Sequence, residues 1–388
     1  MVNTVGPVAN NQQGEPKYEK YRLVKRDESP MSQNYFMNLN YLRGFASLVV
    51  LGSHLFGNFI VVCASEPPRP YQFLDFILRT PLNIGDNGGW FGVSLFFLIS
   101  GFVVTSSAFN ETTRSFLTKR ALRIYVPLII VVVVLWLLAQ SGAQLWGYAS
   151  AGDLDNLFLS ATLLNYFTTG ATAVLDVSWT LAIEIAFYLL VGLSIPIFRK
   201  KPIALVYLLA LIQLPLVLLG QSPAGALHPT AIVVASLPIL GIGATIFFIH
   251  SKLVGAFHGL ALIVALWVDF VWSNWILGTV VGTPGSFYYA NTVYALAFFV
   301  IAVLTEGKWK QARPLDWLAS RSYSIYLVHS PVGFSILLVV NVELQYPYWG
   351  ALALAVVGSF LVAEVLYRVA EKPSVQLGRN LFRRSRSE

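Results

Sequence analysis

The sequence predicts an all-α fold: a polytopic membrane helix bundle of about ten transmembrane helices, with both termini in the cytoplasm. Three observations predict it. Hydrophobic residues make up 56% of the 388 residues and charged residues only 12%, whereas soluble domains carry about 25% charged residues. The apolar residues fall into runs of roughly 20, the length that crosses a bilayer. Lysine and arginine gather in alternate loops, as they do on the cytoplasmic side of membrane proteins.

Ten segments are apolar and long enough to span a membrane. Segment 156–169 is shorter and more polar, so we expect it to lie as an interfacial or re-entrant helix rather than to cross. Proline and glycine inside several spans are tolerated in membrane helices, where they favour kinks or close packing. The predicted spans are 38–61, 90–109, 122–141, 177–198, 202–220, 229–250, 253–272, 286–305, 321–340 and 348–370.

The distribution of lysine and arginine fixes the predicted orientation. With the N-terminus inside, the outer loops hold only Arg69 and Arg79, and the long outer loop 142–176 contains neither lysine nor arginine. A missed span would reverse this bias partway along the chain, and the bias does not reverse. The net charge of +7 therefore faces anionic lipid, which argues against a nucleic-acid partner. The cations on the predicted cytoplasmic side are Lys17, Lys20, Arg22, Lys25, Arg26, Arg114, Lys119, Arg120, Arg123, Arg199, Lys200, Lys201, Lys252, Lys308, Lys310, Arg313, Arg368, Lys372, Arg379, Arg383, Arg384 and Arg386.

The chain divides into three predicted parts. Residues 1–37 are polar and are expected to form a disordered cytoplasmic tail, with no cleavable signal peptide visible. Residues 38–372 form the membrane domain, and residues 373–388 form a basic cytoplasmic tail. Cys63 is the single cysteine, so no intrachain disulfide is expected.

Two ionisable residues, Arg43 and His54, interrupt the first apolar segment. Eleven residues make about three helical turns, so both side chains are expected on one helix face, about 16 Å apart along the axis. Ionisable groups inside a membrane usually face a pathway or a site. The plainer alternatives are an arginine that snorkels to the interface and a packed histidine with a satisfied hydrogen bond.

An acid is expected at a similar depth on another span. Glu184, in the segment VSWTLAIEIAFYLL, lies about 10 Å below the predicted outer boundary, close to the level of His54. An imidazole and a carboxylate at one level suit a base and the group that orients it. The alternative is a lone structural carboxylate, which is costly to bury. In the second span, Ser100 is expected either to bond across helices or simply to pack.

Further polar residues gather near the predicted cytoplasmic ends of two spans. Lys119, Arg120 and Arg123 lie at the predicted cytoplasmic mouth of the third span, where they serve either as topology determinants or as ligands for phosphate. Tyr326 and His329 are expected in the inner half of the ninth span, with core packing as the alternative for His329. Walker loops, dinucleotide fingerprints, paired cysteines and HExxH motifs are missing from the sequence, so no metal is expected.

Six segments in order resemble the membrane acyltransferase family 3, the polytopic O-acyltransferases of bacterial surface glycans and some antibiotics. The resemblance runs from about residue 38 to 375. The chain departs from the family pattern at Ser94, where the family usually has Asp, at Ile185, where a second acid often follows, and at Ser330, where Trp is common. The six segments are NYLRGFASLVVLGSHLF, GVSLFFLISGF, TKRALRIYVP, VSWTLAIEIAFYLL, SYSIYLVHSP and VAEKP.

The resemblance implies an acyl-CoA-dependent acyltransferase of the bacterial inner membrane. An acyl group, usually acetyl, would pass from cytoplasmic acyl-CoA to a hydroxyl of a sugar or glycan, such as an exopolysaccharide, at the outer side. By the resemblance, Arg43 and His54 are the functional pair and Glu184 is the family's acid. The residues expected to bind the donor are Arg120, Arg123, Lys119, Ser100, Tyr326 and His329.

Several alternatives stay open at this point. His54 is expected to act either as general base or as a transient acyl carrier. The acceptor, the acyl group and the oligomeric state, including a homodimer, are open. The main rival is a proton-coupled transporter or exporter that uses the same Arg, His and Glu, although no inverted repeat is visible. Two others are a non-catalytic scaffold subunit and an acyltransferase of another membrane family, against which the Arg-x10-His spacing argues.

Overall fold

The structure is a computed structural model, and it describes residues 36–58, 72–73, 76–77, 80–84, 88–141, 152–278 and 286–382. Most of the predicted tail 1–37 lies outside these residues, as do Cys63 and residues 383–388. Within the described residues the regular elements are all helical. The helices are α3 (Met37–Gly52), α6 (Gly89–Ala108), α7 (Thr113–Gln140), α8 (Leu154–Thr162), α9 (Trp179–Phe198), α10 (Ala204–Leu219), α11 (His228–Val234), α12 (Leu237–His250), α13 (Ala256–Leu277), α14 (Ser286–Leu304), α15 (Arg313–Leu337), α16 (Tyr348–Leu366) and α17 (Lys372–Leu381).

Shorter turns extend several of these helices. A π-helical turn, Ser53–Asn58, continues α3, and others follow α15 (Leu338–Glu343) and α16 (Tyr367–Glu371). Two 3-10 turns, Leu164–Phe167 and Asp176–Ser178, precede α9.

The lengths and apolar composition of the helices confirm the predicted polytopic bundle. Among the described residues, eight helical segments are long and apolar enough to cross a membrane. Helix α10 is apolar but has only 16 residues, and α3 with its π-helical turn covers 37–58. The predicted span 229–250 is divided into α11 and α12 just before Pro238, which occupies the first turn of α12.

Two helices begin earlier than predicted, and both shifts matter for the site. Helix α7 begins at Thr113 rather than near 122, because Thr112 caps it by accepting a hydrogen bond from Ser115 N at 3.3 Å. Lys119 and Arg120, which precede the predicted span, are therefore helical, as Arg123 is. Helix α15 begins at Arg313, with proline in its first turn, so its later residues lie farther along the axis than predicted.

Helix α6 lies at the centre of the bundle and packs against α3, α12, α14 and α9. Its closest neighbour is α12, and small residues allow that contact. A Cβ on Gly101 would lie 2.0 Å from the carbonyl oxygen of Leu240, and a Cβ on Gly243 would lie 2.2 Å from that of Leu98. Only glycine fits at these two crossings, as expected where membrane helices pack through their backbones.

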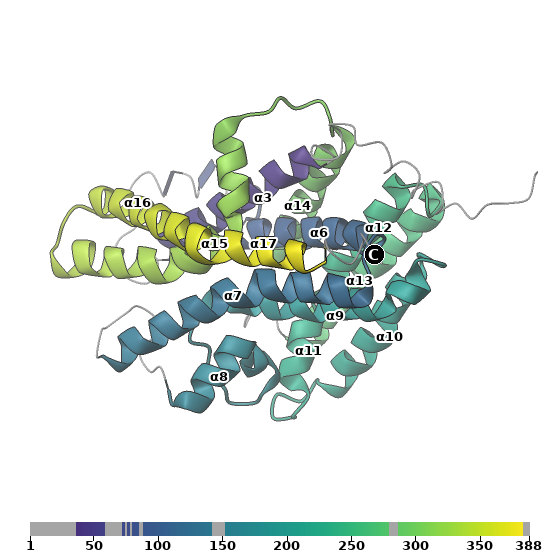
Figure 1. The fold of residues 1–388 in the computed structure, drawn as a ribbon, viewed down its shortest axis with the longest axis horizontal. Helices are drawn as coiled ribbons and strands as arrows, with labels where there is room; N and C mark the ends of the chain where they lie inside the picture. The colour runs from purple at the N-terminus through teal and green to yellow at the C-terminus, as the bar shows by residue number, and fades with distance from the viewer. Residues whose placement is uncertain are drawn as a thin grey trace, which may run out of the picture. The chain divides into compact units, whose positions relative to one another are not determined.

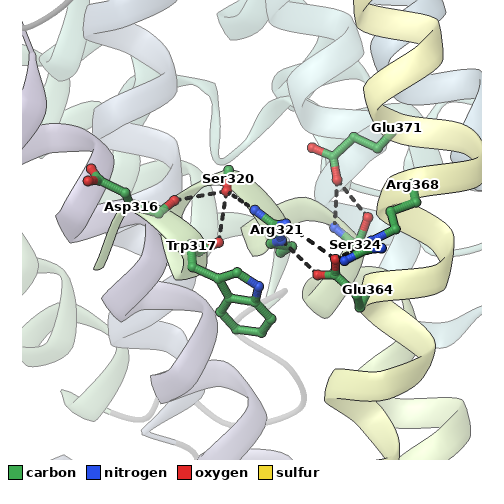
Figure 2. A network of polar contacts seen from close by, with 8 residues as sticks. All are labelled: Asp316, Trp317, Ser320, Arg321, Ser324, Glu364, Arg368 and Glu371. Atoms are coloured by element: carbon green, nitrogen blue, oxygen red, sulfur yellow. Dashed lines mark hydrogen bonds and ion pairs between the residues drawn. The ribbon is translucent and has the colours of Figure 1, made fainter. Parts of the chain in front are cut away.

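Helices α15 and α16 pack side by side, and a polar network joins them (Figure 2). Glu364 accepts from Arg321 Nε at 2.8 Å and from Arg368 Nε at 2.5 Å. The Arg321 guanidinium also lies over the ring of Tyr367, 4.2 Å from its centroid. About one turn beyond Arg321 on α15, Ser324 donates through Oγ to Glu371 at 2.6 Å (Figure 2). These contacts fix the position of α15, which carries part of the site.

The C-terminal helix α17 lies alongside the first part of α7 (Figure 1). Gly378 of α17 approaches Lys119 of α7, because a Cβ at Gly378 would lie 3.5 Å from the Lys119 Cα. The first residues of the predicted basic tail 373–388 are thus helical and packed against the bundle.

The segment between α7 and α9 contains the short helix that the sequence predicted near 156–169. Helix α8 begins after Asp153, whose Oδ1 accepts from Asn156 N at 3.0 Å. Burial raises the pKa of Tyr166 to about 12, so its phenol keeps its proton and contacts Ser178 Oγ at 2.9 Å. This contact holds the turn Asp176–Ser178 in place at the start of α9.

Candidate active site

A narrow cavity of about 70 Å³ lies inside the bundle between α3, α6, α7, α9 and α15. Its size admits a few water molecules or a slender chain rather than a nucleotide. It is lined by Arg43, Val93, Phe96, Phe97, Ser100, Val103, Val104, Arg120, Arg123, Ile124, Thr180, Leu181, Glu184, Tyr188, Ser322, Tyr323 and Tyr326. Of the site residues predicted from the sequence, the cavity brings together Arg43, Glu184, Arg120, Arg123, Ser100 and Tyr326.

One end of the cavity is strongly cationic. Arg120 donates through Nη2 to Ser107 Oγ and stacks over the Phe116 ring. Arg43 and Arg123 have no hydrogen-bond or ion-pair partner among the described residues. Guanidinium groups enclosed without a partner are costly, so this end of the cavity is suited to an anionic ligand.

Glu184 is the acid of the cavity, and both of its carboxylate oxygens accept hydrogen bonds. Ser100 Oγ donates to Oε1 at 2.7 Å, and the Tyr188 phenol donates to Oε2 at 2.9 Å. The carboxylate therefore belongs with the arginines of the cavity. The expected pairing of Glu184 with His54 is not the arrangement found.

The partner of His54 is a second histidine. His54 Nδ1 lies 2.8 Å from His329 Nε2, and the two rings stack with centroids 5.0 Å apart. His329 Nδ1 faces the carbonyl oxygens of Tyr326 at 2.8 Å and Ile325 at 3.2 Å. Because a carbonyl can only accept, His329 Nδ1 carries the proton and its Nε2 accepts from His54 Nδ1. His54 Nε2 is then left unprotonated, as a base requires.

The helix starts explain why these two side chains meet. His329 is 16 residues from the start of α15, and His54 is 17 residues from the start of α3. At 1.5 Å per residue, His329 lies about 24 Å and His54 about 26 Å along the axis from the start of its own helix. The late predicted start of the ninth span had put His329 in the inner half. His54 also lies in the π-helical turn Ser53–Asn58, a feature frequent at functional sites.

Tyr326 borders both the cavity and the histidine pair. Its side chain lines the cavity, its carbonyl oxygen accepts from His329, and its ring lies 5.8 Å from the His329 ring. Its phenol donates to Val177 O at 2.8 Å and contacts Thr180 Oγ1 at 2.7 Å. The ring of Phe96, also in the cavity lining, packs edge-on against it at 5.6 Å. Tyr326 thus lies between the cavity and the histidine pair.

Two predicted donor-binding residues lie elsewhere. Lys119 pairs with Glu111 at 3.1 Å and lies over the Phe382 ring, outside the residues that line the cavity. His329 is fully buried against His54, so it belongs to the histidine pair rather than to the cavity lining. The sequence did not predict its proximity to His54, because the predicted start of the ninth span placed the two histidines at different depths. In the described part of the chain, no group of three or more His, Cys, Asp or Glu could hold a metal ion.

The fold and the site together define an integral, multi-pass membrane protein with ionisable groups enclosed in its helix bundle. The chain matches the family model described as an acyltransferase domain over residues 37–368 and belongs to this family. It is therefore a membrane acyltransferase. This identification favours acyl transfer over the transporter and the scaffold.

Curated relatives agree with this family. The chain is 27% identical to Nodulation protein 10 of Rhizobium leguminosarum bv. viciae, over 91% of this chain and 97% of the relative. It is 26% identical to O-acetyltransferase OatA of Staphylococcus aureus, over 92% of this chain. It is also 26% identical to the putative peptidoglycan O-acetyltransferase YrhL of Bacillus subtilis, over 90% of this chain. The chain spans 60% of OatA and 56% of YrhL. No solved structure matches the chain.

Proposed function

We propose that this protein transfers an acetyl group from acetyl-CoA, bound from the cytoplasmic side, to a hydroxyl of a sugar or glycan at the outer side of a bacterial inner membrane. The catalytic core is residues 38–372, and the tails 1–37 and 373–388 flank it in the cytoplasm. Two relatives named as O-acetyltransferases support the acetyl group, and YrhL, named for peptidoglycan, supports a glycan acceptor.

The cationic end of the cavity is the proposed site for the donor. By the predicted orientation, Arg43, Arg120 and Arg123 lie toward the cytoplasm, where they would bind the phosphates of CoA by charge-assisted hydrogen bonds. The narrow cavity would take the pantetheine arm and lead the thioester toward Tyr326. Movement of the Tyr326 and Phe96 side chains would let the thioester reach the histidine pair.

His54 is the proposed general base. Its Nε2 takes the proton of the acceptor hydroxyl while the acceptor oxygen bonds to the acyl carbon. The carbon–sulfur bond breaks, CoA leaves as the thiolate, and the proton on His54 returns to the thiolate or to water. His329 holds His54 in the tautomer that leaves Nε2 unprotonated, as a general base requires.

The observation that carries this proposal is the His54–His329 hydrogen bond next to a cavity with two unpartnered arginines. The test uses sealed membrane vesicles and [14C]acetyl-CoA, which does not cross membranes. We expect inverted vesicles, which expose the cytoplasmic face, to incorporate base-labile label into envelope glycan, and right-side-out vesicles to incorporate none. Incorporation by right-side-out vesicles alone would refute the proposed direction, and incorporation by neither would refute the donor.

A further inference from the structure

A carboxylate at the predicted outer side is held close to the histidine pair and has no part in the steps above. Asp176 opens the turn Asp176–Ser178, and both of its carboxylate oxygens lie 3.2 Å from the donor Ser330 Oγ. Val177 N donates to Oδ1 at 2.7 Å. Ser330 is buried and Asp176 is exposed, so the carboxylate is fixed by bonds from the protein.

Helix α15 attaches this carboxylate to the histidine pair. Ser330 directly follows His329, and Tyr326, one turn earlier, donates to Val177 O at 2.8 Å. Residues on either side of His329 thus hold the turn that carries Asp176. A charge fixed in this way needs no reorganisation when an opposite charge develops beside it.

The position of Asp176 suits a charge that appears only during the reaction. Asp176 accepts from Ser330, the residue that follows His329, and the His329 imidazole is hydrogen-bonded to His54. Glu184 instead bonds to Ser100 and Tyr188 and faces the arginines of the cavity. His54 becomes positive when it takes the acceptor's proton, and an enclosed imidazolium needs a counter-charge.

We propose that Asp176, held by Ser330, is a positioning residue whose negative charge stabilises His54 while that histidine carries the proton of the acceptor hydroxyl. This inference rests on the proposed function. The proton moves from the acceptor oxygen to His54 Nε2 as the oxygen–carbon bond forms and the thiolate leaves. The positive charge lies on His54, hydrogen-bonded to His329 and stabilised by the charge of Asp176, until the proton passes to the thiolate or to water.

The test compares three variants of the full chain in inverted vesicles with [14C]acetyl-CoA, normalised to the amount of protein. Asp176→Asn removes the charge but keeps the shape and an oxygen that accepts from Val177 N. Asp176→Glu restores the charge, and Ser330→Ala removes the hydroxyl that holds it. We expect Asp176→Asn to lower the maximal rate about tenfold to a hundredfold, with the donor KM unchanged within about twofold. Asp176→Glu should recover part of that loss, and Ser330→Ala should lose less than Asp176→Asn.

Several results would overturn the inference. A wild-type rate for Asp176→Asn would do so, as would equal losses for Asp176→Asn and Asp176→Glu, or an effect confined to KM. If Asp176→Asn does not accumulate, Ser330→Ala serves in its place. A wild-type rate for Ser330→Ala, or an effect confined to KM, would then overturn the inference. One pattern would refute this inference and leave the proposed function standing. In that pattern the wild type is active, His54→Ala is inactive and Asp176→Asn has a normal rate. A wild type without activity would remove the proposed function and this inference with it.

Discussion

At the scale of single residues, the proposed base catalysis depends on which nitrogen of each histidine carries a proton. Two backbone carbonyls fix the proton on His329 Nδ1, and His329 Nε2 in turn fixes the proton on His54 Nδ1. The sequence predicted His54 as a catalytic residue, either general base or acyl carrier, and this assignment remains a prediction. It did not predict His329 as the partner, because the contact joins residues 275 positions apart and no helical spacing relates them.

Substitution of His329 tests this arrangement. His329→Ala removes the acceptor for His54 Nδ1, so the tautomer with a free Nε2 is no longer fixed. We expect the maximal rate to fall about a hundredfold, within the range that general-base catalysis contributes. His329→Gln offers an amide oxygen as acceptor and should lose less. Rates in inverted vesicles measure this, and equal activity of His329→Ala and wild type would contradict the assigned role.

The arginines of the cavity predict a different kinetic effect. Arg123 has no partner among the described residues, so Arg123→Gln should raise the KM for acetyl-CoA about tenfold, equivalent to roughly 1.4 kcal/mol of lost binding, with a smaller change in maximal rate. Lys119→Gln is the matched control, because Lys119 lies outside the cavity lining and pairs with Glu111. Rates measured over a range of acetyl-CoA concentrations give the KM of each of the two variants. An equal rise in KM for both variants would argue against the cavity as donor site.

At the scale of elements, helix ends and helix crossings position the site. The early starts of α7 and α15 bring Arg120 and Arg123 into the cavity wall and bring His329 level with His54. The sequence predicted most apolar cores but not these ends, because polar first turns carry no hydropathy signal. It did predict that glycine inside the spans favours kinks or close packing, and Gly101 packs closely in this way against α12.

An alanine substitution of Gly101 tests the close packing where α6 and α12 cross. Gly101→Ala places a Cβ where the Leu240 carbonyl oxygen lies 2.0 Å away, so the helices must separate. We expect a loss of about 1–3 kcal/mol in stability, as for other overpacked cores. The measurement is the thermal unfolding midpoint of purified protein in detergent. Gly88→Ala is the control, since its nearest new contact is an ordinary 3.5 Å; matching midpoints for the two variants would contradict the packing argument.

At the scale of the whole molecule, the bundle separates two groups of ionisable residues. The arginine-lined cavity lies toward the predicted cytoplasmic side, and the histidine pair lies toward the predicted outer side, with Tyr326 between them. Composition and cation placement were enough to predict the multi-pass bundle. They could not predict the separation, which arises from five helices packed around one cavity. Arg43 and His54 share a helix, yet Arg43 lines the cavity and His54 pairs with α15.

Labelling of single cysteines tests the predicted orientation. In a Cys63→Ala background, Asp155→Cys and Lys200→Cys place thiols at two exposed positions on opposite predicted sides. A membrane-impermeant maleimide added to intact cells should label Asp155→Cys, and it should label Lys200→Cys only after the membrane is opened, because cationic loops stay inside. The reverse pattern would invert the orientation and with it the assignment of the donor side.

Ester-linked acetate on envelope glycan shows in living cells whether His54 is needed for acyl transfer. Cells deleted for the native gene are complemented with wild type, His54→Ala or His258→Ala, and acetate released by mild base is measured. His258 is an exposed histidine at the start of α13 and serves as the control. We predict full acetate with wild type and His258→Ala and none with His54→Ala at equal protein levels; full acetate with His54→Ala would contradict the account.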